Sequence, residues 1–120
     1  MAPRAVSNWQ GGVCVITGAG SGIGGGLARH AAAAGMHVVG VDVDEPGLAR
    51  LEKAIRDHGQ SIETRRVDLR DEAAVEALAD HVFAKHGKVN LLFNNAGVLV
   101  DGKSWERPMR DWRWSFEVNV

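Results

Sequence analysis

The feature that most constrains this chain is the segment Val13–Gly24, VCVITGAGSGIG, in which a β-branched run leads directly into glycines. This order indicates a strand, a tight turn and the start of a helix. Glycines let the backbone approach a pyrophosphate closely, and the unpaired N–H groups at the helix N-terminus face its negative charge. The segment therefore predicts a dinucleotide-binding site.

The glycines of this segment fit two registers. A G-x-G-x-x-G pattern is present at Gly20, Gly22 and Gly25, but it begins well past the end of the strand. The set Gly18, Gly22 and Gly24 fits better, because its first member follows the strand directly. The chain has 15 glycines among 120 residues, so the glycine pattern alone is weak evidence.

Apolar runs and helical periodicity alternate along the rest of the chain. The expected strands are residues 12–17, 37–42, 61–68 and 89–93, and the expected helices are residues 22–34, 44–59, 71–87 and 109–120. Strands that alternate with helices predict an α/β fold with right-handed crossovers. We expect a partial Rossmann-like doubly wound parallel sheet with strand order 3-2-1-4 and helices on both faces.

Helical spacing also predicts which side chains face the core. The expected inward residues are Ile23, Leu27 and Ala31, then Leu48, Leu51 and Ile55, then Val75, Leu78 and Val82. Asp44 and Asp71 are expected to cap their helices. Gly25 and Gly26 each cost about 1 kcal/mol relative to alanine inside a helix, and close packing against a strand would explain one of them.

Composition excludes several classes of function. The net charge of −1 and the pI of about 6.5 give no sign of a nucleic-acid or membrane surface. Cys14, the single cysteine, is expected to be a buried hydrophobe, and the five histidines lack metal-ligand spacing, so no metal site is expected. Without a signal or spanning segment, we expect a cytoplasmic protein. Residues 1–10 are expected to form a flexible arm, and residues 11–120 one NAD-binding domain.

Asp42 ends the second expected strand, about twenty residues beyond the glycine turn, as the dinucleotide fingerprint requires. A carboxylate there accepts hydrogen bonds from an adenosine ribose and repels a 2′-phosphate. No Arg or Lys lies in the turn or immediately after Asp42 to neutralise such a phosphate. NAD is therefore preferred over NADP. The alternative is a solvated aspartate in a strand-to-helix turn.

Two motifs together resemble the short-chain dehydrogenase/reductase family: Thr17-Gly18-x-x-x-Gly22-Ile23-Gly24, and Asn94-Asn95-Ala96-Gly97 directly after the fourth expected strand. The resemblance covers residues 11–120, about the first half of a family member. The cofactor-binding residues that it implies, together with Asp42, are Gly18, Ser21, Gly22, Ile23, Gly24, Asp68, Leu69, Asn95, Ala96 and Gly97. It also implies that Asp68 meets the adenine amino group; taken alone this residue is more typical of a turn or cap, and its position at the carboxyl edge of the sheet makes the two interpretations about equal.

The resemblance implies two further roles for asparagines. Asn94 would brace the central strands. Asn119, on the inward face of the last expected helix, would belong to the catalytic set and hold a lysine through a water. The family's chemistry also needs a serine and a Tyr-x-x-x-Lys, and the chain contains no tyrosine. We therefore expect the N-terminal, cofactor-binding part of an oxidoreductase that acts on an alcohol or carbonyl, inactive by itself; the full-length protein would be a homo-oligomer.

Two alternatives stay open at this point. One is a non-catalytic module that binds NAD or an adenine nucleotide, and the other is a methyltransferase that uses S-adenosylmethionine. Trp105, Trp112 and Trp114 are expected to pack in the core or in an oligomer contact, with Trp105 alternatively lining a substrate pocket.

Overall fold

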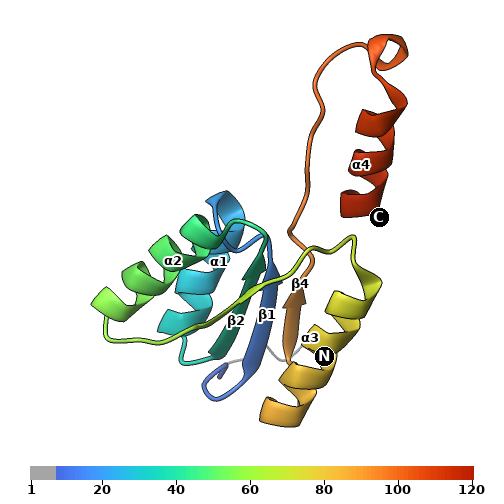
Figure 1. The fold of residues 1–120 in the computed structure, drawn as a ribbon. Coiled ribbons are helices and arrows are strands. Elements are labelled where there is room, and N and C mark those ends of the chain that lie inside the picture. Colours follow the sequence, from blue (N-terminus) through green and yellow to red (C-terminus); the bar gives the residue numbers. More distant parts are fainter. Residues whose placement is uncertain (1–7) are drawn as a thin grey trace, which may run out of the picture.

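A computed structural model describes residues 8–120, which form one parallel four-stranded sheet with helices on both faces (Figure 1). The strand order β3-β2-β1-β4 confirms the predicted order. The strands are β1 (Val13–Thr17), β2 (His37–Asp42), β3 (Glu63–Arg66) and β4 (Leu91–Phe93). The helices are α1 (Gly22–Ala33), α2 (Glu45–Asp57), α3 (Glu72–His86) and α4 (Met109–Asn119), with a short 3-10 helix η1 (Ser104–Glu106) before α4.

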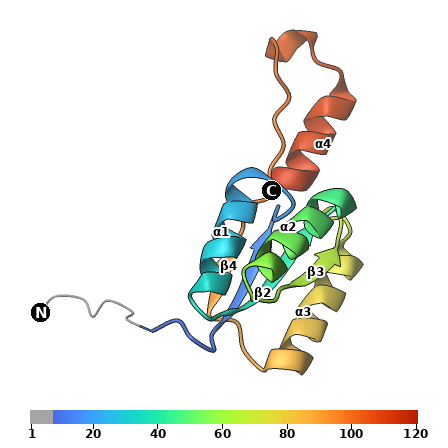
Figure 2. The same cartoon turned by 90° about the vertical axis from the view of Figure 1, so that its left-hand side faces the viewer.

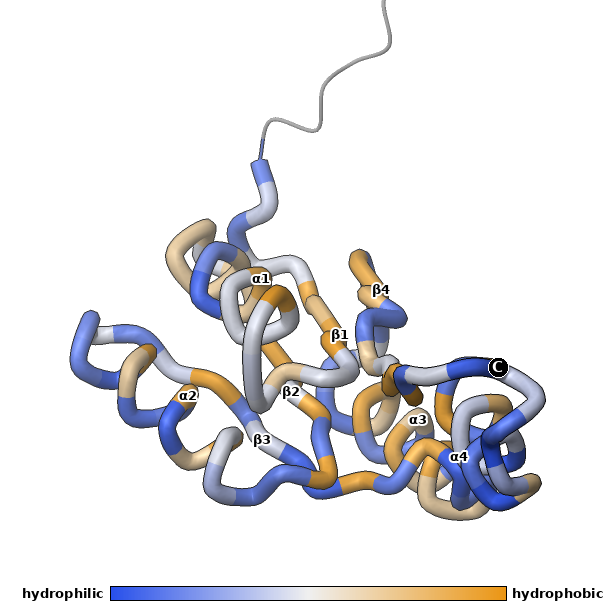
Figure 3. Tube along the Cα trace, turned by 90° about the horizontal axis from the view of Figure 1, so that it is seen from above, coloured by the Kyte–Doolittle hydropathy of each residue, from blue (hydrophilic) through white to orange (hydrophobic). Residues whose placement is uncertain are grey.

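Strand β1 serves two separate cores, because successive side chains of a strand point to opposite faces of the sheet. Cys14 and Ile16 belong to the core under α1 and α2, whereas Val13 and Val15 pack with Val82 of α3. Figure 3 shows α1 and α2 on one side of the strands and α3 on the other. Cys14 is fully buried, which confirms the predicted buried hydrophobe, and this burial raises the pKa of its thiol to about 11.

The helix ends follow from local chemistry. Asp44 and Asp71 cap α2 and α3, since their carboxylates accept hydrogen bonds from the backbone N–H groups of Gly47 and Ala74 at 3.0 and 3.2 Å. The chain leaves α3 through Gly87, whose φ of 72° is in the left-handed region that favours glycine. The predicted caps are confirmed.

Both edge strands are shorter than predicted, because each pairs on one side only. Strand β3 pairs with β2 over Glu63–Arg66, and β4 pairs with β1 over Leu91–Phe93. Just before β4, Asn90 continues the hydrogen bonding to β1. Its side-chain oxygen accepts a hydrogen bond from Val13 N at 2.8 Å, and its backbone N–H donates to Val13 O at 2.9 Å.

Two expected core positions are wrong. Ile23 of α1 is 76% exposed, and Val75 of α3 is 37% exposed. Helix α1 instead packs through small residues, and its buried positions are Gly24, Gly25, Ala28, Ala31 and Ala32. A Cβ on Gly25 would lie 3.3 Å from the Ala19 carbonyl oxygen, while one on Gly26 would meet open space. Close packing thus accounts for the first of these glycines only.

The N-terminal residues divide into two parts. Residues 1–7 of the expected arm lie outside the described residues, whereas Trp9 packs partly buried against the core and its carbonyl accepts a hydrogen bond from Gly12 N at 2.9 Å. At the other end, α4 stands beyond the carboxyl edge of the sheet (Figure 2) and has no buried residue. Within residues 8–120, no helix is long and apolar enough to cross a membrane.

Candidate cofactor site

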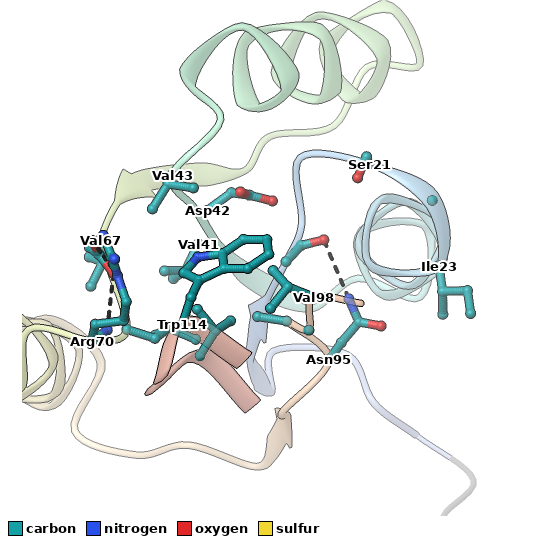
Figure 4. A pocket seen from close by; sticks show the side chains of 17 residues that line it. Ser21, Ile23, Val41, Asp42, Val43, Val67, Arg70, Asn95, Val98 and Trp114 are labelled. Carbon is teal, nitrogen blue, oxygen red and sulfur yellow. Dashed lines mark hydrogen bonds and ion pairs between the residues drawn. The ribbon is translucent and has the colours of Figure 1, made fainter. Parts of the chain in front are cut away.

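A pocket of about 410 Å³ opens at the carboxyl edge of the sheet (Figure 4). Ligands of open α/β sheets bind at this edge, where the strand order reverses. Of the residues expected to bind the cofactor, those that line the pocket are Gly18, Ser21, Gly22, Ile23, Asp42, Asp68, Leu69, Asn95, Ala96 and Gly97. Gly24 does not line the pocket, but it packs against Gly18, which does. Within the described residues, no group of three or more metal-ligating side chains is present.

The glycine turn has a shape that side chains would prevent. Gly18 has a φ of 68°, and a Cβ there would come within 2.8 Å of the Asn95 amide nitrogen. A Cβ on Gly24 would overlap the Gly18 carbonyl oxygen. At Gly22, where φ is 55°, a Cβ would meet no atom within 4 Å, so its surroundings are open. These glycines bring α1 against the turn and leave space above it.

The N-terminus of α1 differs from those of α2 and α3. Its N-cap, Ser21, makes no side-chain hydrogen bond to the first turn, whereas aspartates cap α2 and α3. The first N–H groups of a helix have no intrahelical partner, and they carry the positive end of the helix dipole. Open space and free donors together fit a diphosphate.

Asp42 is held in place by backbone donors. Gly20 N donates to its Oδ2 at 2.9 Å, and Asp44 N donates to its Oδ1 at 3.0 Å. The half-buried carboxylate therefore connects the glycine turn to the loop that follows β2, while it still faces the pocket. Its remaining lone pairs are available to vicinal hydroxyls of a ribose.

Asp68 forms an ion pair with Arg70, a pocket residue that sequence reasoning missed. Arg70 donates from its Nε to both carboxylate oxygens, at 3.0 and 3.1 Å, and from an Nη to one of them at 2.6 Å. These hydrogen bonds lower the pKa of Asp68 to about 2. The one signal in the sequence is a cation two residues beyond Asp68, on the loop that follows the third expected strand.

The bracing contact comes from Asn95 and not from Asn94, which corrects the expected assignment. The Asn95 amide donates to the carbonyl oxygens of Thr17 at 3.1 Å and Gly18 at 3.4 Å. The Thr17 hydroxyl in turn accepts hydrogen bonds from the N–H groups of Asn95 and Ala96 at 3.1 and 3.0 Å. Asn94 is exposed and makes no side-chain hydrogen bond within residues 8–120. Adjacent residues leave a strand in opposite directions, which decides between the two asparagines.

Asn119 lies at the end of α4 and holds the segment after β4. Its Oδ1 accepts a hydrogen bond from Val98 N at 2.8 Å, and its Nδ2 donates to Val98 O at 2.9 Å. Val98 lines the pocket, so Asn119 supports the pocket wall without lining it. The prediction that Asn119 faces the interior from α4 is wrong, because Asn119 is exposed.

The pocket also has apolar walls that the sequence did not reveal. Trp114 and Val118 reach it from α4, one helical turn apart. Core packing of the tryptophans is wrong: Trp114 and Trp112 are each 40% exposed, and Trp105 is 79% exposed with the Lys103 ammonium 5.8 Å from its ring centre. Trp105 does not line the pocket.

Comparison with known proteins gives a consistent result. Residues 12–120 match the family model described as short chain dehydrogenase. The chain is 39% identical over 108 residues to a CLA biosynthesis dehydrogenase/reductase of Lactiplantibacillus plantarum, covering 90% of this chain and 38% of that protein. It thus spans about two fifths of the length of this relative.

Solved structures agree with this match. A short chain dehydrogenase/reductase from Burkholderia phymatum in complex with NAD is 48% identical, with a TM-score of 0.88 over 94% of this chain and 40% of that one. A metagenomic short-chain oxidoreductase in complex with NADP is 35% identical, with a TM-score of 0.86 over 92% of this chain and 51% of that one. The chain belongs to the short-chain dehydrogenase/reductase family.

Proposed function

We propose that residues 11–120 form a domain that binds NAD in preference to NADP, within an oxidoreductase that acts on an alcohol or carbonyl group of a small molecule. The observation that carries the proposal is the Asp42 carboxylate, which Gly20 N and Asp44 N hold at the pocket edge. A 2′-phosphate bound at this point would face a fixed negative charge, whereas a ribose diol would find hydrogen-bond acceptors.

The nearest pocket cation does not reverse this preference. Arg70 lines the same pocket, but its guanidinium is already paired with Asp68. A 2′-phosphate would have to compete for a charge-assisted interaction at 2.6 Å. The two relatives in complex with NAD and with NADP leave the choice open for the family, so the proposal rests on this chain's own charges.

Each part of the pocket has a distinct task in this proposal. The α1 N-terminus binds the diphosphate, Asp42 binds the adenosine ribose, and Asn95 to Gly97 border the path to the nicotinamide. The bound nicotinamide supplies the site that accepts or donates hydride. Asn119 acts as a positioning residue, because its contacts to Val98 fix the segment beside that path.

The oxidoreductase would work in the cytoplasm as a homo-oligomer. Support for assembly comes from α4, where Trp112 and Phe116 stack with ring centres 6.5 Å apart and are 40% and 60% exposed. Exposed aromatic residues of this kind are typical of protein–protein contacts. Light scattering on the natural full-length protein tests this part, and a monomer at all concentrations would contradict it.

The cofactor preference is tested by calorimetry with NAD and NADP on the natural full-length protein. We expect NAD to bind more tightly, and Asp42→Asn to reduce the ratio of the two affinities by about tenfold, because a neutral amide no longer repels the phosphate. Asp44→Asn is the matched control: it removes a neighbouring charge outside the pocket and keeps a good helix cap.

Three outcomes separate the possibilities. Tighter binding of NADP, or a ratio that Asp42→Asn leaves unchanged, would overturn the preference for NAD. Binding of NAD without any NADH formation across a panel of alcohols would favour a nucleotide-binding protein without catalysis. Tighter binding of S-adenosylmethionine than of NAD would overturn the proposal as a whole.

A further inference from the structure

The adenine end of the pocket follows from the positions already described. With the diphosphate at the α1 N-terminus and the adenosine ribose at Asp42, the purine base extends past the end of β2. The pocket residues on that side are Val43, Val67 and Arg70, on the loops that follow β2 and β3. The two valines offer aliphatic surface to the base, but none of these three residues has an aromatic ring.

The aromatic ring comes from α4. Figure 4 shows the Trp114 indole among the side chains that line the pocket, which include Asp42, Val43 and Val98. The side chain is 40% exposed, so a substantial part of the indole surface is free for contact. Within residues 8–120, no residue of α4 is buried.

The other tryptophans after β4 have different surroundings. Trp112 stacks on Phe116 and lines a separate small pocket of about 150 Å³, and Trp105 lies under the Lys103 ammonium. Only Trp114 among these three lines the large pocket at the sheet edge. This difference makes Trp112 a matched control on the same helix.

We propose that Trp114 binds the purine base of the dinucleotide by stacking, with the valines beyond β2 and β3 on the opposite side of the base. The inference rests on the proposed binding of NAD. Any purine presents an aromatic face, and stacking on an indole is favourable without a directed hydrogen bond. The bound base would therefore connect α4 to the sheet. Within the described residues, no buried side chain of α4 makes such a connection.

Tryptophan fluorescence and calorimetry with AMP and NAD test the proposal on the natural full-length protein. Both ligands should quench the emission, and Trp114→Phe should remove that quenching while the affinity falls by less than about fivefold. Trp114→Ala should weaken AMP and NAD binding by the same factor, about tenfold, since both ligands lose the same contact. Trp112→Phe and Trp112→Ala should keep the quenching and the affinities.

Each contrary result has a separate meaning. If the natural protein binds NAD and Trp114→Ala binds it equally well, the stacking proposal is overturned and the proposed function stands. If Trp114→Ala binds more tightly, the indole competes with the base for the pocket, which also overturns stacking. If the natural protein binds neither AMP nor NAD, both proposals fail. Should the alanine variant not fold, Trp114→Phe still decides through the quenching.

Discussion

Two regions that build one pocket are held in different ways. The unit β1–α1–β2 is held by close packing: its strands are largely buried on both faces, and Gly18 and Gly24 leave no space for a Cβ at the turn. In the segments β3–α3 and β4–α4, where, within residues 8–120, Val82 is the one buried hydrophobic residue of α3, polar side chains add the contacts that position the walls, such as Asn95 on Thr17, Asn119 on Val98, and Glu63 on Lys85. Steric fit thus fixes the diphosphate end of the pocket, and hydrogen bonds and charges fix its other walls.

The difference has a consequence for substitutions. At the close contacts of the packed unit, Gly18 and Gly24, an added atom has no room, so even a single methyl group disturbs the turn. In the polar-held segments the geometry depends on donors and acceptors, so removal of one partner is the damaging change. The expected effects therefore differ in kind and in size between the two regions.

The largest effect is expected for Gly24→Ala in the packed unit. The new Cβ would overlap the Gly18 carbonyl oxygen, so α1 or the turn must move. We expect a loss of about 3 kcal/mol in the free energy of unfolding and loss of detectable NAD binding. Urea unfolding and calorimetry on the natural full-length protein measure both.

Gly26→Ala, two positions along the same helix, is the control. A Cβ there meets no atom within 4 Å, and alanine is the better helix former. The free energy of unfolding should rise by up to about 1 kcal/mol with NAD affinity unchanged. Equal destabilisation by both substitutions would show that helix propensity, and not the contact with Gly18, governs this turn.

A smaller effect is expected where the two regions meet, at Thr17. Its hydroxyl accepts from Asn95 N and Ala96 N and donates to Phe93 O at 3.4 Å, and the side chain is buried. Thr17→Val keeps the volume but removes the hydroxyl that Ala96 N and Asn95 N share, and only Asn95 N keeps another acceptor, Phe93 O at 2.9 Å; the change should cost about 2 kcal/mol in urea unfolding. Thr64→Val, on edge strand β3, should change stability by less than about 0.5 kcal/mol. A similar loss in the free energy of unfolding for Thr17→Val and Thr64→Val would show that the hydrogen bonds of Thr17 do not hold the two regions together.

The two regions also differ in how well the sequence predicts them. Steric requirements appear in the sequence as glycine spacing and β-branched runs, so β1, the turn, α1 and the strand order were predicted. Asp42 was placed correctly because a strand end fixes its position. Contacts between polar side chains leave no such local pattern: the bracing role of Asn94 came only from the family resemblance, and the structure gives this contact to Asn95.

The errors have one physical source. Helical periodicity identifies an apolar face but not what covers it, so Ile23 was expected in the core although it faces the pocket. Arg70 and Trp114 come from segments distant in sequence that meet only at the sheet edge. Only the folded chain brings such residues together, whereas caps such as Asp44 depend on neighbours in the sequence.

The smallest effect is expected at Glu63, which links β3 to α3 on the polar-held side. Burial raises the pKa of Glu63, but hydrogen bonds from Lys85, Arg65 and His81 outweigh burial and lower it to about 2, from an ordinary value of 4.5. A carboxyl whose pKa is depressed by folding stabilises the protein above its ordinary pKa, and this contribution is lost as the pH falls toward the folded value. The free energy of unfolding should therefore decline between about pH 4.5 and pH 2.

Glu63→Gln removes the titrating group and separates its contribution from that of other carboxylates. The variant should lose about 1 kcal/mol at neutral pH and show a shallower decline in acid, measured as the urea midpoint against pH. Glu76→Gln, at an exposed position of α3, should keep the slope of the natural protein. If both variants keep that slope, the Glu63 hydrogen bonds do not hold β3 to α3, and the contrast between packed and polar-held regions would be confined to the pocket. If only Glu63→Gln flattens it, the contrast extends across the sheet to the start of β3, outside the pocket lining.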